Sequence, residues 1–493
     1  MWQRILRVLV CKRALPGPTI LRTIGITQFS IDPVWAILDA VSETEHTDAP
    51  VGPSKLRRFL RRLARGCAYL VLFLAIAIGF WMSGAVYNHY MRFPREEAAW
   101  QELRAQRRGF PEMGPWTEYR GILHAHSKFS HDSVVPMEEI LRVLQRTRID
   151  FICLSDHCID GRADFDWQWH GLHDSKLFIP GFEMRDGFMP FGDRPETVLS
   201  NSTDSATLAR QIVENGGVLF YAHPEEPRDW DRPELTGMEI YNIHSDFKRF
   251  RRGLLRLLPE VLLNQQHFPD HVFRLIFQRP SDFLQHWDQL NATRHLTGIA
   301  GNDCHQNTGL RLTYLPSGQL QIDDTSPKVP RQIKLNWLTR LIARALFGPL
   351  EPNQVLFHLQ LDPYERMARF VSTHVLASDL SQPAILDALR AGRVYVGFDM
   401  IADSSGFRWL TGGITNQVVM GETAEFSKGT VLHARSPLPC RFTVVQDGRA
   451  VHRAEGRELN WTPPGPGKYR VEAELQVRND WVPWVYANPI QLR

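Results

Sequence analysis

The chain is organised around the stretch Gly121-Ile-Leu-His-Ala-His-Ser-Lys-Phe-Ser-His-Asp-Ser133. Its short apolar run ends in His124 and His126, which are two positions apart. Residues i and i+2 of a strand share a face, so both imidazoles are able to reach one metal ion. The stretch therefore predicts a strand that delivers two ligands to a metal site.

The same pattern returns five times downstream: an apolar run of strand length ends in a residue type that binds divalent metals. The runs and the residues that follow them are 151–154 with Asp156 and His157, 177–182 with Glu183, 217–222 with His223, 238–243 with His244, and 296–302 with Asp303 and His305. Six predicted strands thus end in candidate ligands.

Helical patterns lie between several of these runs, at 135–146 and at 206–215, and Gly216 follows the second as a C-terminal stop. Alternating strands and helices predict an α/β fold with a mostly parallel sheet. In a closed α/β barrel the C-terminal ends of the parallel strands meet at one mouth, where ligands from six strand ends would converge.

The combination of these motifs resembles the PHP (polymerase and histidinol phosphatase) superfamily, and it looks most like the CehA/McbA-like branch. The resemblance rests on His-x-His-Ser-x-x-Ser-x-Asp-Ser at 124–133, Ser-Asp-His at 155–157, Glu183, His223 and Asp-Cys-His at 303–305. It covers roughly 116–399 and implies a distorted seven-stranded (βα) barrel that holds up to three divalent ions and hydrolyses phosphoesters.

The resemblance also implies the ligands and catalytic residues. The implied metal ligands are His124, His126, Asp132, His157, Glu183, His223, His244, Asp303 and His305, with Glu183 bridging two ions. Catalytic roles are predicted for Glu183, Asp156 and His305. His131 and Asp132 both stand where the family has one ligand, and Asp132 is preferred because that branch has Asp two positions after the Ser. Asp156 either binds metal or orients the site from behind the ligands.

The predicted cofactors are two to three divalent ions. Imidazole mixed with carboxylate suits zinc, manganese or iron(II) better than magnesium or calcium. Such ions hold a phosphate and activate a water molecule, so hydrolysis needs no covalent nucleophile. In agreement, the sequence has no Gly-x-Ser-x-Gly elbow, no phosphate-cradling loop with Lys-Ser/Thr and no dinucleotide fingerprint.

Several other functions remain open at this stage. A 5′–3′ exonuclease and a carbamate or carboxyl ester hydrolase use related sites. An amidohydrolase-type barrel also opens with His-x-His, but its bridging Lys is missing here. A non-catalytic membrane-anchored binding protein is disfavoured because all nine candidate ligands are present.

With 493 residues and 43% apolar composition, the chain is long enough for two or three domains. The predicted domains are 1–66, a cytoplasmic basic segment; 67–87, a transmembrane helix; 88–115, a spacer; 116–399, the PHP hydrolase domain; and 400–493, a small antiparallel β-sandwich. In the last domain short strands are expected at 431–434, 441–446, 468–477 and 481–490, and Asp447-Gly448 predicts a hairpin turn.

Residues 67–87 contain no charged side chain, and at about 1.5 Å per residue they are long enough to cross the ~30 Å hydrocarbon layer. Lys and Arg crowd the N-terminal side between 55 and 65. The positive-inside rule therefore places the N-terminus in the cytoplasm. This predicts a single-pass protein of the inner membrane of a bacterium, with the catalytic domain periplasmic or extracellular.

Two insertions and two further elements are expected in the hydrolase domain. The insertion 247–293 begins with a basic cluster that either steers an anionic substrate, touches lipid headgroups or forms a solvated cover helix; its members are Lys248, Arg249, Arg251, Arg252 and Arg256. A second helical insertion is expected at 330–350. A strand pattern follows at 364–377, and Ser381 begins a helix that ends near Gly392.

The charge distribution bears on whether the substrate is a small molecule or a long nucleic acid. The net charge is +3, but 1–65 holds 11 Lys/Arg against 5 Asp/Glu, which leaves 46 against 49, or −3, for the rest. Long nucleic acid normally requires an extended basic track. A small phosphomonoester or phosphodiester is therefore preferred as the partner, and nucleic-acid ends are the alternative.

The six cysteines form no Cys-x-x-Cys pair and no evenly spaced framework, so they predict neither a zinc knuckle nor a disulfide scaffold; they are Cys11, Cys67, Cys153, Cys158, Cys304 and Cys440. Strand alternation points Cys304 away from the face shared by Asp303 and His305. A packing role is therefore expected for it.

Overall fold

The computed structural model describes residues 55–109, 114–194, 196–250, 253–323, 330–413 and 416–493. The predicted cytoplasmic segment lies outside these ranges up to residue 54, and so does Cys11. The chain divides into two compact units, Met1–Ile76 and Ala77–Arg493. The candidate metal ligands all belong to the second unit.

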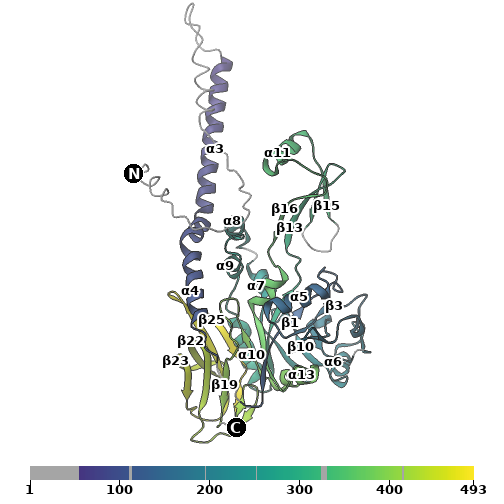
Figure 1. Cartoon of the computed structure of the whole chain (residues 1–493), viewed down its shortest axis with the longest axis vertical. Coiled ribbons are helices and arrows are strands. Elements are labelled where there is room, and N and C mark those ends of the chain that lie inside the picture. Colours follow the sequence, from purple (N-terminus) through teal and green to yellow (C-terminus); the bar gives the residue numbers. More distant parts are fainter. Residues whose placement is uncertain (1–54, 110–113, 195, 251–252, 324–329, 414–415) are drawn as a thin grey trace, which may run out of the picture. The chain divides into compact units, whose positions relative to one another are not determined.

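The first described element is α3 (Lys55–Tyr87), which continues through the π-helical turn η1 (Asn88–Arg92) into α4 (Phe93–Ala105) (Figure 1). By length and composition this helix is long and apolar enough to cross a membrane. Most of the apolar side chains of α3 are exposed, with Phe80 at 83%. The predicted span 67–87 thus lies on a helix whose surface suits a bilayer better than water.

The segment predicted as a spacer is helical and packed. Phe93 and Trp100 of α4 are fully buried, and the Trp100 indole stacks on His271 with 4.1 Å between ring centroids. Arg104 donates two hydrogen bonds of 2.8 Å, to the carbonyl oxygens of Met400 and Ile401. The end of the helix is therefore held against the body of the second unit.

The central sheet is mostly parallel, as its strand and helix alternation predicts. Parallel pairing joins six strands, in the order β10 (Val218–Tyr221), β11 (Leu235–Asn242), β12 (Thr297–Cys304), β1 (Thr117–Ala125), β2 (Phe151–Cys153) and β6 (Lys176–Ile179). β8 (Phe188–Phe191) pairs with β10 in the antiparallel sense. An isolated bridge between Gly181, just after β6, and Phe191 completes a circuit of pairings.

Three helices beside this sheet match the sequence predictions within a few residues: α5 (Met137–Thr147), α6 (Ser205–Glu214) and α13 (Gln382–Ala391). The Asp204 side chain caps α6 by accepting from the Thr207 amide, and Ser381 caps α13 through the Ala384 amide. Gly216, just after α6, has φ = +91°, a conformation that glycine adopts without strain. Local capping signals thus define these helix ends.

Short elements fill the connections of the sheet. They are β3 (Asp156–His157), β4 (Arg162–Asp164), η2 (Phe165–Trp167), β5 (Gly171–His173), β7 (Phe182–Glu183), η3 (Arg185–Gly187) and β9 (Val198–Ser200). β3 and β7 pair in parallel, with His157 opposite Glu183. That pairing brings two candidate ligands side by side.

The insertion at 247–293 is helical, with α7 (Ile243–Phe250), α8 (Leu254–Asn264), α9 (Pro269–Arg274) and α10 (Ser281–Asn291). The second insertion belongs to a four-stranded antiparallel sheet, in the order β15 (Arg331–Lys334), β14 (Gln319–Asp323), β13 (Gly309–Tyr314) and β16 (Gln354–Gln360). Helix α11 (Trp337–Phe347) connects β15 to β16. Figure 1 shows this arm leaving the body of the second unit with α11 at its far end.

One strand prediction is wrong in its first half. The stretch 364–377 begins as a helix, α12 (Tyr364–Phe370), and only then becomes the strand β17 (Ser372–Ala377). Tyr364, Met367 and Ala368 are buried, and their spacing of three and four residues is that of one helix face. β17 pairs with β1 in the antiparallel sense.

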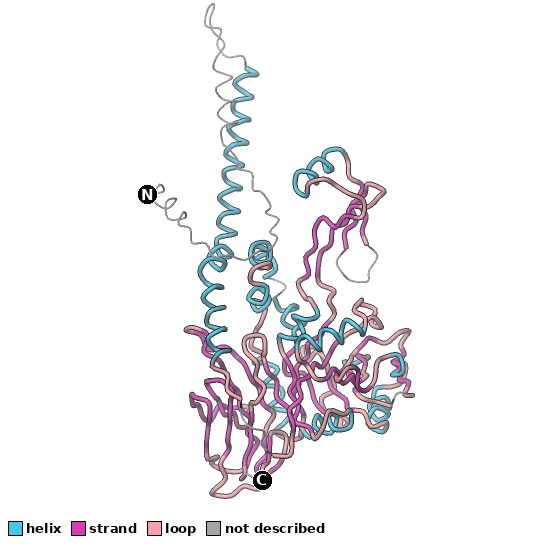
Figure 2. Tube along the Cα trace, viewed as in Figure 1, coloured by secondary structure: helices cyan, strands magenta, loops and turns pink. Residues whose placement is uncertain are grey.

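After α13 the described chain consists of strands and loops (Figure 2). The strands are β18 (Val394–Gly397), β19 (Arg408–Thr411), β20 (Val418–Val419), β21 (Thr423–Ala424), β22 (Leu432–Gln446), β23 (Arg449–Trp461), β24 (Gly467–Val477), β25 (Asp480–Ala487) and β26 (Ile490–Leu492). The two strands expected at 431–434 and 441–446 are one strand, β22, whose pairing is irregular in between. β23 was not anticipated.

The Asp447-Gly448 hairpin is confirmed. Both residues have positive φ, 47° and 81°, as the favoured two-residue hairpin turn requires, and they join β22 to β23. β25 also pairs with β18, which pairs with β17. The C-terminal strands are therefore hydrogen-bonded in series to the sheet that carries the candidate ligands.

Candidate metal centre

His124 and His126 lie at the end of β1, and their ring centroids are 5.3 Å apart. They do not converge through regular strand alternation, because His124 has φ = +64° and the pairing of β1 with β12 shifts between Leu123 and Ala125. An irregularity of this kind re-aims a side chain. The predicted convergence is present, but a distortion of the strand end produces it.

Histidine and carboxylate side chains form three overlapping groups whose ligand atoms lie within 4.8 Å of one another. The groups are His126 with Asp132, His157 and His305; His124 with His126 and Asp303; and His124 with Glu183 and His223. Because His124 and His126 each belong to two groups, the three form one continuous centre.

Glu183 lies in the middle of this centre. Its Oε2 atom is 3.3 Å from His124 Nε2, 3.6 Å from His126 Nε2 and 3.7 Å from His157 Nδ1. Its Oε1 atom is 3.3 Å from His223 Nε2. The carboxylate thus faces four imidazoles that come from three different segments, a geometry compatible with a bridging ligand.

Asp303 and His305 enter from β12 and the residue that follows it. Asp303 Oδ1 is 3.1 Å from His124 Nε2 and 3.4 Å from His126 Nε2. His305 stacks on His126 with 3.8 Å between ring centroids. Cys304 between them is fully buried within the hydrophobic core, which agrees with the packing role predicted for it.

Asp132, and not His131, lies in the centre. Asp132 Oδ2 is 3.0 Å from His305 Nε2 and 3.4 Å from His157 Nε2, and Ser130 Oγ donates to Asp132 Oδ1 at 2.7 Å. His131 is exposed and belongs to none of the three groups, although its ring lies 4.7 Å from that of His157.

His244 is the most distant of the predicted ligands. It lies in the first turn of α7 and not at the end of a strand, because β11 already ends at Asn242. Its side chain is 47% exposed, and its Nδ1 atom is 3.7 Å from Asp303 Oδ2. It belongs to none of the three groups.

Asp156 lies behind the ligands. Its carboxylate accepts hydrogen bonds from the Ser127 amide at 2.5 Å, from Ser127 Oγ at 2.8 Å and from Gln168 Nε2 at 2.7 Å. Burial raises its pKa despite these bonds. Since Ser127 follows His126, Asp156 is placed to hold the loop that carries His126; its predicted catalytic role remains a prediction.

Glu239 is a functional residue that the sequence analysis missed. It is fully buried in β11, where His124 Nδ1 donates to Glu239 Oε1 at 2.5 Å and the His223 amide donates to Oε2 at 2.8 Å. A Cβ atom on Gly301 would collide with this carboxylate. A single Glu within the apolar run 238–243 was the available signal, since a buried carboxylate needs partners.

The charge of the centre is unusual. In the described part of the chain, the ion-pair partners found for Asp132, Glu183, Glu239 and Asp303 are all histidines. Burial disfavours ionisation of Glu183, but the facing imidazoles of His124 and His223 hold its pKa well below the usual range. Four carboxylates, two of them buried and two partly buried, have no Lys or Arg partner among the described residues and call for additional positive charge.

The histidines of the centre differ in the direction in which their pKa is shifted. Burial, together with the neighbouring His305, lowers the pKa of His126 to about 3. Burial opposes charging of His223 as well, but its hydrogen bonds to Glu183 and Glu225 raise its pKa to about 10. His126 is therefore a neutral imidazole at neutral pH, which is the form that binds a metal.

Two buried atoms support a metal in this centre. His126 Nε2 and Asp303 Oδ1 are both inaccessible to solvent and make no hydrogen bond of suitable geometry, although they lie 3.4 Å apart. Buried polar atoms normally have partners, so such exceptions require an explanation. A divalent cation bound by imidazole nitrogen and carboxylate oxygen would satisfy both atoms. The residues present thus fit a metal-dependent hydrolase.

The basic cluster predicted at Lys248–Arg256 is largely neutralised where it is described. Lys248 Nζ lies 3.3 Å from Glu225 and 3.4 Å from Glu226, and Arg249 pairs with Asp282. Arg251 and Arg252 lie outside the described residues. A cavity of about 410 Å³ near the end of β10 is lined by Arg185, Arg228 and Arg232. These arginines also pair with carboxylates, those of Asp186, Glu226 and Asp229.

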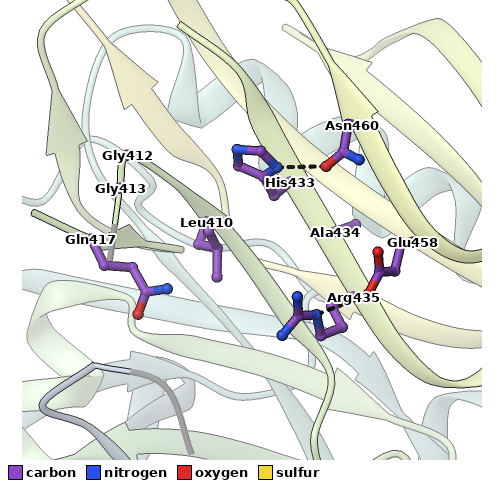
Figure 3. A pocket seen from close by; sticks show the side chains of 9 residues that line it. All are labelled: Leu410, Gly412, Gly413, Gln417, His433, Ala434, Arg435, Glu458 and Asn460. Atoms are coloured by element: carbon purple, nitrogen blue, oxygen red, sulfur yellow. Dashed lines mark hydrogen bonds and ion pairs between the residues drawn. The ribbon is translucent and has the colours of Figure 1, made fainter. Parts of the chain in front are cut away.

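Another cavity, of about 200 Å³, lies between β19 and β22 (Figure 3). In it His433 Nδ1 is 2.6 Å from Asn460 Oδ1, and Arg435 pairs with Glu458 at 3.3 Å. The candidate metal ligands do not line this cavity, so it is separate from the metal centre.

No family model and no curated protein matches the chain. Among solved structures, it is similar to a two-domain protein from Bacteroides vulgatus that contains a predicted PHP-like metal-dependent phosphoesterase. The two chains are 14% identical, the match covers 77% of this chain and 97% of the other, and the TM-score is 0.33. The functional argument therefore starts from the side chains of the metal centre.

Proposed function

We propose that this protein is a membrane-anchored, metal-dependent phosphoesterase of the PHP superfamily, in its CehA/McbA-like branch, with the distorted seven-stranded barrel of that superfamily. The observation that carries the proposal is the set of three overlapping groups of metal-binding side chains that share His124 and His126. Scattered histidines on a folded surface would not share ligands in this way.

In this proposal two to three zinc, manganese or iron(II) ions bind at the three groups. When bound, such ions neutralise phosphate oxygens, lower the pKa of a water molecule and stabilise the leaving oxygen. The centre has the side-chain chemistry for them, because it combines imidazole nitrogens with ionised carboxylates and lacks competing Lys or Arg partners among the described residues.

The surrounding residues orient the ligands. Glu239 accepts the Nδ1 proton of His124, which leaves the Nε2 lone pair free to point into the centre. Ser130 Oγ lies 3.1 Å from His126 Nδ1 and donates to Asp132. His305 faces Asp132. Burial opposes charging of His305, but the carboxylates of Asp303 and Asp132 raise its pKa to about 9. Because a metal binds only the neutral imidazole, an ion bound at His305 would displace this proton.

We further propose that the substrate is compact, a phosphomonoester or a phosphodiester. The arginines of the cavity near the end of β10 would hold its charged end. The remainder of the chain beyond Arg65 is slightly acidic, which disfavours an extended nucleic-acid track.

The test is a metal and substrate assay on the full-length protein in detergent. We expect two to three equivalents of transition metal, and hydrolysis of p-nitrophenyl phosphate or its bis ester that a chelator abolishes. Carbamate esters and 5′-labelled oligonucleotides belong in the same panel. Unchanged activity of a metal-free sample would refute the metal mechanism, whereas cleavage of oligonucleotides alone, slower at higher salt, would favour the exonuclease.

Orientation is a separate part of the proposal. The Lys/Arg cluster before residue 67 favours a cytoplasmic N-terminus, which would place the second unit in the periplasm or outside the cell. A reporter that works only outside the cytoplasm, fused after Arg493, should be active. Activity of a cytoplasmic reporter at the same position would reverse the orientation.

A further inference from the structure

Helix α8 carries apolar side chains on its outer face. Leu255, Leu258 and Leu262 are 74%, 42% and 60% exposed. Their spacing of three and four residues places them on one stripe of the helix. In a helix on the surface of a water-soluble domain, this stripe would face the core.

The inner face of α8 holds polar side chains beside the buried Leu257 and Val261. Glu260 and Asn264 are 6% and 0% exposed. Asn88 Nδ2 donates to Glu260 Oε1 at 2.7 Å, and Asn264 Oδ1 lies 2.8 Å from His89 Nδ1. The helix thus makes polar contacts with the protein on its inner face while three of its leucines face outward, as apolar side chains do in a helix that contacts lipid.

The contacts of α8 place it at the depth of the apolar helix. The Trp81 indole donates to the carbonyl oxygen of Leu255 at 2.9 Å. Trp81 lies inside the uncharged stretch 67–87, six residues or about 9 Å before its end. The side chains of Phe80 (83%) and Tyr87 (56%) on α3 are exposed as well. A bilayer that surrounds α3 to this depth must also meet the leucines of α8.

Helix α11, at the end of the arm, is a second exposed apolar helix. Five of its large apolar side chains are between 47% and 79% exposed: Trp337, Leu338, Leu341, Ile342 and Leu346. Its charged residues are Arg340 and Arg344, with no acidic residue. An apolar helix with Trp and only basic charges is typical of helices that lie in a membrane interface.

Both helices are joined directly to the metal centre. α8 follows α7, whose His244 lies 3.7 Å from Asp303, and the eight residues of α7 span about 12 Å. The arm begins with β13 at Gly309, four residues after His305. Contact of α8 and α11 with lipid would therefore hold the metal centre close to the bilayer surface.

We propose that α8 and α11 embed their apolar faces in the bilayer that α3 crosses, and that the phosphoester hydrolysed at the metal centre is carried by a lipid of that bilayer. The inference rests on the proposed function, for which it names the class of substrate. Lipid contact would explain why the insertion that contains α8, next to the metal centre, exposes apolar side chains.

Lipid contact is tested on the full-length protein reconstituted in phosphatidylglycerol vesicles. Cys11, Cys67 and Cys158 are replaced by Ser, and a polarity-sensitive fluorophore is attached through Leu258→Cys, Leu262→Cys or Leu341→Cys. We expect blue-shifted emission that spin-labelled lipids quench. Leu172→Cys in β5, where the native side chain is 60% exposed, is the matched control and should respond only to aqueous iodide. Iodide quenching at all positions, or quenching only by a spin-labelled second copy of the protein, would overturn the proposal.

Substrate presentation is tested by a second comparison. The variant Leu255→Gln/Leu258→Gln/Leu262→Gln should hydrolyse vesicle-borne phosphatidic acid at least about tenfold more slowly than wild type, with p-nitrophenyl phosphate hydrolysis unchanged. Leu341→Gln/Leu346→Gln should act in the same direction, and Leu172→Gln should not. Equal loss on both substrates, or a wild type that hydrolyses only the soluble ester, would overturn the lipid substrate. A metal-loaded wild type inactive on both would refute the proposed function, while the fluorophores would still decide lipid contact.

Discussion

Strand β1 contributes residues to two clusters of histidine and carboxylate side chains, one near its start and one at its end. The clusters differ in whether their polar atoms are all paired. Near its start, Glu118 is 2.9 Å from His374 Nδ1, and Asp399 is 2.9 Å from His374 Nε2. At its end, His124 and His126 meet Glu183 and Asp303. The first cluster is closed, since none of its buried side-chain nitrogen and oxygen atoms lacks a hydrogen-bond partner, whereas the second contains buried atoms that do.

The closed cluster is balanced by arginines. Arg120 pairs with Asp399 at 2.9 Å, and Arg408 pairs with Glu118. His374 stacks on Tyr395 with 4.4 Å between ring centroids. In the metal centre, the described partners of the carboxylates are imidazoles only. The comparison teaches that a histidine beside a carboxylate indicates a metal site only where nitrogen lone pairs remain free and no fixed cation supplies the balancing charge.

Ser404 makes the closed cluster resemble a catalytic triad, but the protonation state argues against it. Its hydroxyl is 3.2 Å from His374 Nε2 and donates to Asp399 Oδ1 at 2.7 Å. Burial opposes charging of His374, but Asp399 and Glu118 raise its pKa to about 9. A histidine protonated at neutral pH has no lone pair with which to act as a base.

The largest effect is expected from Glu183→Gln, which removes the central charge of the open centre. We expect hydrolysis to fall about 1000-fold, corresponding to the several kcal/mol that bound metal contributes. Metal content should fall as well, whereas the midpoint of thermal unfolding of the metal-free protein should change little. Elemental analysis and turnover of the same sample measure both. Wild-type turnover in this variant would remove Glu183 from the site.

The opposite result is expected from His374→Ala in the closed cluster. Loss of one partner of a buried ion pair typically costs about 3–5 kcal/mol of unfolding free energy. Metal content per folded protein should be unchanged, since the contacts of His374 are with Glu118, Asp399, Ser404 and Tyr395. Denaturant unfolding and elemental analysis test this. A variant that loses metal and keeps its stability would reverse the roles assigned to the two clusters.

Glu239→Gln tests whether Glu239 orients the metal ligand His124. The amide cannot accept the Nδ1 proton of His124 as a carboxylate does, and loss of such an outer partner typically weakens metal affinity or activity by about 10–100-fold. Titration of metal into the metal-free protein gives the affinity. Gln168→Glu, which perturbs the buried partners of Asp156, is the comparison for a general effect of substitution near the centre. Wild-type affinity in Glu239→Gln would show that Glu239 does not orient His124.

The closed cluster also predicts a pH dependence of stability. The pKa of His374 is raised to about 9 in the folded protein, against about 6.5 for an unperturbed histidine. Its contribution to stability is therefore complete below about pH 6.5 and is lost as the pH rises through about 9. Unfolding of the metal-free protein followed from pH 6 to 10 should show this loss, and the loss should be smaller in His374→Ala, which keeps only the contributions of histidines such as His223 and His305. Identical profiles for the two proteins would contradict the assignment.

The smallest effect is expected from His131→Ala. His131 is exposed and outside the three groups, so activity and metal content should stay near wild type. Asp132→Ala, one position along, removes a carboxylate that faces both His157 and His305 and should lower both. Reversed effects of this neighbouring pair would make His131 the ligand.

Much of the centre was predictable because strand ends and ligand types are local features. His124, His126, Glu183, His223 and Asp303 each follow or end an apolar run, and the three groups contain all of them. His244 shows the limit of this argument, since its apolar run ends in a strand two residues earlier and the histidine belongs to a helix. Periodicity does not define where a strand stops with that precision.

The tertiary structure alone decided which polar residues support the centre and which close a separate network. Glu239 lies 115 positions from His124, and Glu118 lies 256 positions from His374, so neither pair has a local signature. The outward leucines of α8 follow the same rule. Amphipathic spacing is visible in the sequence, but which side faces the protein depends on Asn88, His89 and Trp81, far along the chain. A sequence determines local periodicity and the chemistry of its side chains, whereas burial and pairing result from contacts between distant segments.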